Sequence, residues 1–392
     1  MSLAPAAPEP AVLQATALAV ASVDAELPDP HARHLAQSYF PALDGLRAVA
    51  IIAVLWHHSL PAVADGWVAR GHVGVRLFFA LSGFLISSRL LAERRATGSI
   101  ALGHFWLRRS LRIFPLYYAV LALFALYLGL RAPDAGSRHF FDSLVFHATY
   151  TSNWFIDYAV SHPVWFAFGW SLACEEQFYA WWPPVLRRSN RGTAALLVLL
   201  GVFAVQQLVQ YGVLGHWLAS YPTIERILGS LAPALSLGAL LALCLERRSS
   251  FALLWVPFGK YASAAAAALV LGIGVLLGHG GAPPLALDLA FAALVGSVVL
   301  VPTTWLGRLL SRAPLRSLGR VSYGVYLFHV PVLGLVRRLL PSLALRPELL
   351  FPLALALSWG LAALSFRFLE APLLALGRRP PLRPVNASLQ FQ

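Results

Sequence analysis

Apolar runs of eighteen or more residues recur along most of this chain, and they constrain its fold more than any other feature. A run of that length is long enough to cross the hydrocarbon core of a bilayer as a helix. The composition agrees, because 58% of the 392 residues are hydrophobic and only 12% are charged, whereas a soluble domain carries about 25% charged residues. We therefore predict an all-α integral membrane protein.

Ten apolar ranges predict about ten transmembrane helices. They cover residues 42–60, 72–92, 112–130, 164–186, 193–213, 227–246, 261–279, 285–303, 321–340 and 348–369. The polar and aromatic segment His139–Phe155 is more typical of a loop or a re-entrant piece. We predict a disordered N-terminal tail over residues 1–38, a transmembrane domain over 39–372 and a cytoplasmic C-terminal tail over 373–392, with no soluble domain.

The distribution of arginine predicts the orientation. If the N-terminus is cytoplasmic, the loops after the second, fourth, sixth and eighth spans are internal, and these loops hold most of the basic residues. Cytoplasmic loops of membrane proteins carry such an excess. Both termini are therefore expected in the cytoplasm, and the ninth loop, with Arg337 and Arg338, fits this orientation least well. The net charge of +13 is then explained by topology and by anionic headgroups, and nucleic-acid binding is disfavoured.

Arg47 and His58 lie in the first predicted span, where ionisable groups are costly unless they face an interior cavity. Eleven steps of about 100° bring the two residues to within roughly 20° of one face, about 16 Å apart along the helix axis. His57 lies about 100° away from His58. The alternative is that Arg47 reaches the inner headgroups while the histidines cap the outer end of the helix.

Two further groups of charged residues lie in or beside spans. Arg109 and Arg112 precede the third span and share a helix face, so they can hold a phosphate between them. A cluster that only sets topology is an equal alternative. Glu175 and Glu176 lie within the fourth span, and two adjacent carboxylates at that depth are hard to explain by packing. We interpret them as functional.

The ninth span holds Ser322, Tyr326 and His329 at spacings of three to four residues, so they can line one face. A buried core histidine is an alternative reading of His329. Cys174 and Cys244 both fall in apolar spans, which predicts neither a disulfide framework nor a metal site.

Six segments, in their order along the chain, form a more specific pattern. They are PALDGLRAVAIIAVLWHH (41–58), GVRLFFALSGFLISSRLL (74–91), FWLRRSLRIFPLYY (105–118), WSLACEEQFYAWWP (170–183), LGRVSYGVYLFHVPV (318–332) and SFRFLEAP (365–372). Together they resemble acyltransferase family 3, a family of integral membrane proteins that includes O-antigen and exopolysaccharide O-acetyltransferases. The resemblance extends over nearly all of the chain beyond residue 40.

The resemblance can be carried over residue by residue. The family's arginine and histidine with ten residues between them, its Arg-x-x-Arg pair, its tryptophan-serine pair and its paired glutamates match Arg47 and His58, Arg109 and Arg112, Trp170 and Ser171, and Glu175 and Glu176. Cys174 departs from the apolar residue usual at that position. No appended hydrolase-like domain, which some relatives carry, is expected.

The resemblance implies transfer of an acyl group, acetyl by default, from cytoplasmic acetyl-CoA to a hydroxyl of a cell-surface or exported polysaccharide or its lipid-linked precursor. Arg47, Arg109 and Arg112 would bind the phosphates of CoA. Our hypothesis makes His58 the general base on the acceptor hydroxyl, with acceptance of the acyl group by His58 as the alternative. Glu175 or Glu176 would fix its imidazole ring.

The remaining candidates are supporting residues: Trp170 beside the substrate, and Ser171, Tyr326 or His329 at the thioester carbonyl. A small lipophilic acceptor such as a macrolide is an alternative within the enzyme class. A proton-coupled transporter or exporter is the alternative of another class, since it also keeps charged groups inside spans. High Ala, Arg, Leu and Pro content with a single lysine, Lys260, is typical of a GC-rich bacterium, which predicts a multi-pass inner-membrane protein.

Overall fold

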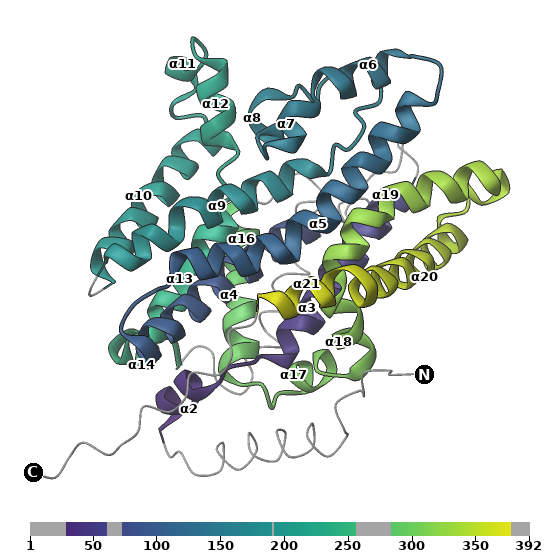
Figure 1. The fold of residues 1–392 in the computed structure, drawn as a ribbon. Helices are drawn as coiled ribbons and strands as arrows, with labels where there is room; N and C mark the ends of the chain where they lie inside the picture. Colours follow the sequence, from purple (N-terminus) through teal and green to yellow (C-terminus); the bar gives the residue numbers. More distant parts are fainter. Residues whose placement is uncertain (1–28, 61–72, 190–191, 256–283, 378–392) are drawn as a thin grey trace, which may run out of the picture.

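The computed structural model describes residues 29–60, 73–189, 192–255 and 284–377, and within these residues the chain forms helices and no strand (Figure 1). The elements are α2 (Pro30–Ala36), α3 (Pro41–Ser59), α4 (Val73–Thr97), α5 (Leu102–Gly129), α6 (Ala135–Asp142), α7 (Leu144–Ala148), α8 (Ser152–Phe155), α9 (Gly169–Arg188), α10 (Thr193–Gln210), α11 (Gly215–Leu218), α12 (Pro222–Gly229), α13 (Pro233–Glu246), α14 (Arg248–Trp255), α16 (Pro284–Leu300), α17 (Trp305–Leu310), α18 (Ala313–Arg320), α19 (Ser322–Leu339), η2 (Pro341–Leu343), α20 (Pro347–Ser365), the π-helical turn η3 (Phe366–Glu370) and α21 (Ala371–Leu376). The predicted all-α fold is confirmed for the described residues.

Nine of the ten predicted spans fall on helices, and the remaining one, the seventh span at 261–279, lies outside the described residues. In the described part of the chain, four helices are long and apolar enough to cross a membrane, or up to six if each of two bent helix pairs forms one span. The count of ten and the orientation of the termini stay predictions. The segment His139–Phe155 contains short helices, none long enough to cross.

The boundaries differ from prediction at three places. Pro30–Ala36, placed in a disordered tail, form α2, because Pro30 starts the helix and the Asp29 carboxylate accepts a hydrogen bond from the His31 N–H at 3.1 Å. Residues 1–28 lie outside the described part. Helix α9 begins at Gly169, five residues later than expected, after Phe166 adopts a positive φ of 61°. Helix α21 continues to Leu376, past the predicted boundary at residue 372.

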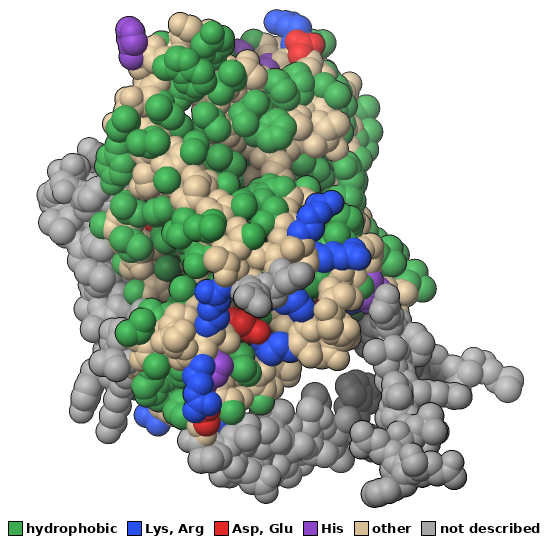
Figure 2. Space-filling model, turned by 90° about the vertical axis from the view of Figure 1, so that its left-hand side faces the viewer, with side chains coloured by type: hydrophobic (Ala, Val, Ile, Leu, Met, Phe, Trp, Pro, Cys, Tyr) green, Lys and Arg blue, Asp and Glu red, His purple; other side chains and the backbone are tan. Residues whose placement is uncertain are grey.

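The helices form a bundle with two distinct ends. Helices α2, α14, α17 and α18 lie at one end, and α6, α7, α8, α11 and α12 lie at the other (Figure 1). At the first end, called the basic end here, Arg95 pairs with Glu246, which ties α4 to α13, and Arg248 lies 3.3 Å from Asp29, which ties α14 to α2. Figure 2 shows basic side chains over the middle and lower parts of one face and a largely hydrophobic surface above them.

Helices α3 and α4 form the centre of the bundle because small residues let their neighbours approach closely. A Cβ atom at Gly83 of α4 would lie 2.1 Å from the Leu235 carbonyl oxygen of α13, and one at Gly238 of α13 would lie 2.1 Å from that of Ala80. Such contacts between small residues are a common means of association of membrane helices. The close contact holds α4, which forms one wall of the site, in a fixed position.

Candidate active site

Three adjoining cavities follow helix α4 through the bundle. The arginine cavity, near the basic end, is lined by Arg89 and Ser82 of this helix; the central cavity by Ser82 and Val75; and the histidine cavity, at the opposite end, by Val75. Since Val75 and Arg89 are fourteen residues apart, the series covers about 21 Å along the helix. Arg47, Ser82, Arg109 and Arg112 line both the arginine and the central cavities, and Tyr326 lines both the central and the histidine cavities.

The arginine cavity gathers five cations and few counter-charges. Its arginines are Arg47, Arg89, Arg108, Arg109 and Arg112. Weak pairs link Arg108 to Glu93 at 3.7 Å and Arg47 to Asp44 at 3.8 Å. Neither Arg89 nor Arg112 makes an ion pair with any carboxylate in the described residues. This cavity can therefore accept a polyanion such as a group of phosphates.

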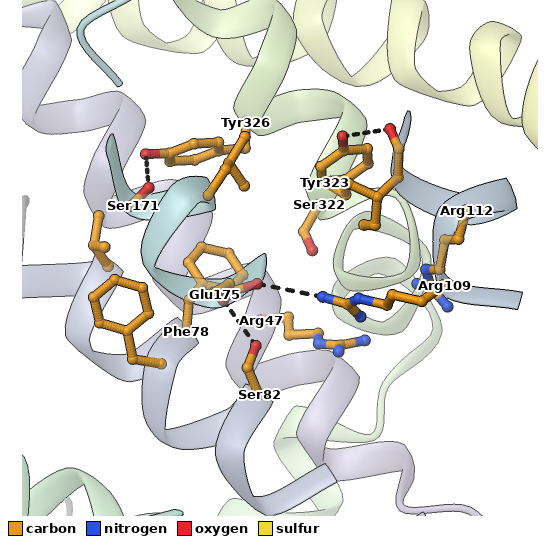
Figure 3. A pocket seen from close by; sticks show the side chains of 14 residues that line it. Arg47, Phe78, Ser82, Arg109, Arg112, Ser171, Glu175, Ser322, Tyr323 and Tyr326 are labelled. Carbon is orange, nitrogen blue, oxygen red and sulfur yellow. Dashed lines mark hydrogen bonds and ion pairs between the residues drawn. The ribbon is translucent and has the colours of Figure 1, made fainter. Parts of the chain in front are cut away.

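Arg109 joins the arginine cavity to the central cavity. Its guanidinium lies 3.5 Å from a Glu175 oxygen (Figure 3). It also lies 3.4 Å from a Glu176 oxygen and stacks over the Tyr179 ring at 3.9 Å. Glu175 also accepts hydrogen bonds from Ser82 at 2.9 Å and from Tyr179 at 3.1 Å. This network compensates the charge of both carboxylates inside the bundle.

The network corrects one prediction. We expected Glu175 or Glu176 to fix the imidazole of His58, and the structure instead pairs both carboxylates with Arg109. His58 donates from Nδ1 to the main-chain carbonyl of Val54, one turn earlier in α3, at 2.9 Å. The partner of the His58 ring is therefore on its own helix, since Val54 lies four residues earlier in α3 and its carbonyl faces the ring.

The hydrogen bond from His58 has a chemical consequence. A main-chain carbonyl only accepts hydrogen bonds, so Nδ1 carries the proton and Nε2 is left with a free lone pair. His58 and its neighbour His57 line the histidine cavity. The expected face of α3 therefore lines cavities at both of its ends, with Arg47 in the arginine and central cavities. The structure therefore places a base at the end of the cavity series that is opposite the arginine cavity.

His329 packs against the ring of His58. The two rings are 4.8 Å apart between centroids and meet edge to face. His329 is fully buried, its Nδ1 lies 2.5 Å from the Tyr326 carbonyl oxygen, and its Nε2 has no hydrogen-bond partner among the described residues. Hence main-chain carbonyls hold both histidines in the tautomer with the proton on Nδ1. The edge-to-face contact lets His329 support the ring of His58.

Ser171 and Tyr326 lie where the central cavity meets the histidine cavity. Their hydroxyl oxygens are 2.7 Å apart (Figure 3), and the Tyr326 hydroxyl is 3.0 Å from the Phe168 carbonyl oxygen. Ser322 lines the central cavity, whereas Trp170, one residue before Ser171, lines the histidine cavity. All of the predicted site residues thus line these cavities except Glu176 and His329, which contact the lining residues Arg109 and His58.

Sequence reasoning did not select several residues of the site. Tyr179 lies four residues after Glu175 on α9, so helical spacing from a predicted site residue would have indicated it. Arg89 and Ser82 lie seven residues apart on α4 and had no such signal, because neither was a predicted site residue. In the part of the chain that the structure describes, no three His, Cys, Asp or Glu residues are grouped to hold a metal ion.

The family model described as an acyltransferase domain matches residues 40–367. The chain belongs to acyltransferase family 3. It is 30% identical over 375 residues to the peptidoglycan O-acetyltransferase OatA of Listeria monocytogenes, covering 86% of this chain and 56% of the relative. It is 30% identical over 379 residues to the putative peptidoglycan O-acetyltransferase YrhL of Bacillus subtilis, covering 87% and 56%.

A putative O-acetyltransferase of Staphylococcus aureus strain COL is 29% identical over 389 residues, covering 88% of this chain and 60% of the relative. The matched part of this chain thus spans only 56–60% of the length of these relatives. No solved structure matches the chain. The family and the apolar helices together indicate a multi-pass membrane acyltransferase.

Proposed function

We propose that this protein is an O-acetyltransferase of a bacterial inner membrane that moves an acetyl group from cytoplasmic acetyl-CoA to a hydroxyl of an exported glycan. The observation that carries the proposal is the series of three cavities, cationic at one end and holding a histidine base at the other. The names of the relatives favour a peptidoglycan-type glycan over other exported polysaccharides.

The donor binds from the basic end in this proposal. The phosphates of CoA pair with Arg47, Arg109 and Arg112, to which the cavity adds Arg89 and Arg108. The pantetheine arm then follows α4 through the central cavity, and its thioester reaches the Ser171–Tyr326 pair. This path explains why Arg47 and His58 lie at opposite ends of one face of α3.

The chemistry at His58 is a direct transfer. Nε2 takes the proton of the acceptor hydroxyl as its oxygen attacks the thioester carbonyl. The hydroxyl protons of Ser171 and Tyr326, which point to the Phe168 carbonyl in this structure, turn to the thioester carbonyl oxygen as negative charge develops there. The carbon–sulfur bond then breaks, the CoA thiolate leaves, and the imidazolium returns its proton to the thiolate. The acetyl ester and CoA are the products.

The test uses purified protein in liposomes with radiolabelled acetyl-CoA on the outside or the inside. An acetyltransferase forms labelled ester on a saccharide acceptor and releases free CoA in equal amount, from donor on one side only. Movement of solute without release of CoA would instead identify a transporter. Ester formed on a small lipophilic acceptor but on no saccharide would contradict the glycan as substrate.

A further inference from the structure

The histidine cavity differs from the arginine cavity in its chemistry. It is lined by aromatic and uncharged polar side chains, and Arg226 is the one Arg or Lys among its described lining residues. No carboxylate of the described residues lines it. Its interior volume is about 580 Å³, which lies within the roughly 300–1,000 Å³ typical of small-molecule sites. A ligand that is uncharged apart from one anionic group fits this lining better than a polyanion such as CoA.

Two aromatic side chains give the cavity surfaces for stacking. Trp170 is 39% exposed and Tyr158 is 37% exposed. The edge-to-face contact of Trp170 with Phe79, 6.0 Å between ring centroids, holds the indole in place. Aromatic rings that are apolar on the face and polar at the tip suit the apolar faces and outward hydroxyls of sugar rings.

Hydrogen bonds fix the polar part of the wall. The indole N–H of Trp154 donates to the Ser230 hydroxyl at 3.0 Å, which ties the segment after α12 to α8. Asn153 and Gln177 exchange hydrogen bonds of 3.0 and 2.9 Å, which ties α8 to α9. Ser230 and Asn153 both line the cavity, so their polar groups are held beside its interior.

Arg226 lies one turn before Ser230, on the same side of α12. Its side chain is exposed and makes no ion pair with a carboxylate in the described residues. A guanidinium held beside a cavity without a counter-ion is a ready partner for a carboxylate or phosphate. Arg226 can therefore bind an anionic group of a ligand in this cavity.

We propose that the histidine cavity is the acceptor subsite and that it takes a saccharide bearing an anionic group. The sugar ring stacks on Trp170 and Tyr158, its reacting hydroxyl faces Nε2 of His58, and Arg226 pairs with the anion. This inference rests on the proposed acetyltransferase function. The anion has two chemical sources, the pyrophosphate of a lipid-linked precursor or a carboxylate on the sugar itself.

The experiment measures acetyl transfer from acetyl-CoA by the full chain in liposomes to three acceptors. They are a polyprenyl-pyrophosphate disaccharide, a soluble disaccharide with one carboxylate, and the same disaccharide as its neutral amide. Arg226→Gln is expected to raise the KM of one or both anionic acceptors by roughly tenfold or more, and to leave the neutral one unchanged. Whichever anionic acceptor loses affinity identifies the source of the anion.

Trp170→Leu is expected to raise the KM of all three acceptors, with Trp170→Phe between Leu and the wild type. Acetyl-CoA binding, measured separately, reports whether each variant is folded. Arg346→Gln, an exposed cation outside the three cavities, is the matched control and is expected to change no acceptor KM.

The outcomes separate this proposal from the proposed function. Wild-type protein that acetylates no saccharide would overturn both. Wild-type transfer with unchanged acceptor KM in Arg226→Gln and Trp170→Leu would overturn the acceptor subsite alone. Equal use of neutral and anionic acceptors by the wild type would remove the anion from the proposal.

Discussion

At the scale of the residue, Arg109 is the counter-charge of the two adjacent carboxylates inside the bundle. It pairs with Glu175 and Glu176 and stacks on Tyr179. Removing one partner of a buried pair leaves the others uncompensated, which typically costs about 3–5 kcal/mol. We expect Arg109→Gln to lower the free energy of unfolding in detergent by about 3 kcal/mol.

A second substitution tests the cause of that loss. In the Arg109→Gln background, Glu175 and Glu176 have lost their counter-charge. Glu176→Gln then removes one of these two uncompensated carboxylates, and it should restore part of the stability. If the double variant were no more stable than Arg109→Gln alone, charge compensation would not be the role of Arg109.

Arg112 is the matched contrast to Arg109, since it lines the same two cavities without an ion pair among the described residues. We expect Arg112→Gln to leave the unfolding temperature nearly unchanged and to raise the KM of acetyl-CoA roughly tenfold, the loss of one charged hydrogen bond to a phosphate. Acetyl-pantetheine, which lacks the nucleotide phosphates, is the control donor. An equal rise in KM for both donors would contradict phosphate binding.

Substitutions of His329 test whether its ring, which packs against His58, positions the base. Phenylalanine keeps the aromatic contact and removes the unpartnered Nε2, so His329→Phe should fold. We expect its kcat to fall modestly, because the hydrogen bond from Nδ1 to the Tyr326 carbonyl that orients the ring is lost, while the KM of acetyl-CoA stays the same. His329→Asn, which also loses the ring, should be the more impaired. Wild-type kcat in both variants would show that His58 needs no support from this side.

At the scale of the element, helix α4 is placed by its contact with α13. Any side chain at Gly83 meets the Leu235 carbonyl, so Gly83→Ala forces the two helices apart. Overpacking of this kind typically costs about 1–3 kcal/mol, and we expect a lower thermal unfolding temperature with reduced acetyl-CoA binding. Gly201→Ala on α10, with open space around its Cβ, is the control and should be neutral or stabilising.

Helix α9 shows how an element carries a site along its length. Ser171, Glu175 and Tyr179 follow at four-residue steps, so the same face lines the central cavity and then the arginine cavity. The late start of α9 at Gly169 puts Ser171 in its first turn, beside Tyr326. The adjacent position, Trp170, then points into the histidine cavity.

The ninth loop illustrates a contact that hydropathy and charge counting do not anticipate. Arg337, the residue that fits the predicted orientation least well, donates to the His58 main-chain carbonyl at 2.8 Å. A cation at the C-terminal end of a helix compensates its unpaired carbonyls. Its position on α19 therefore has a structural reason independent of topology.

At the scale of the whole molecule, the sequence alone predicted the helical membrane fold and many of the residues that line the three cavities. Apolar length predicts helices because each run must satisfy its own backbone in lipid. The eleven-residue spacing of Arg47 and His58 predicted one face, because helix geometry is regular. Local periodicity is thus enough wherever a residue and its partner share one helix.

The rest depends on contacts between helices, which periodicity does not encode. The partner of Glu175 is on α5, and that of Ser171 is on α19. The expectation that a glutamate fixes His58 was wrong because the carbonyl of Val54 is nearer along the same helix. Asn153, Tyr158 and Arg226 of the histidine cavity were missed because they lie in the short helices α8 and α12 and in the loop after α8, outside the predicted spans.

The central claim is that acetyl-CoA enters among the arginines and that its acetyl group is transferred beside His58. The most direct measurement is the initial rate of acetyl transfer by His58→Gln in liposomes, at a donor concentration that saturates binding. We predict wild-type affinity for acetyl-CoA and a rate lower by roughly 10²–10⁴-fold, with His57→Gln far less affected. Transfer by His58→Gln at the wild-type rate would contradict the account.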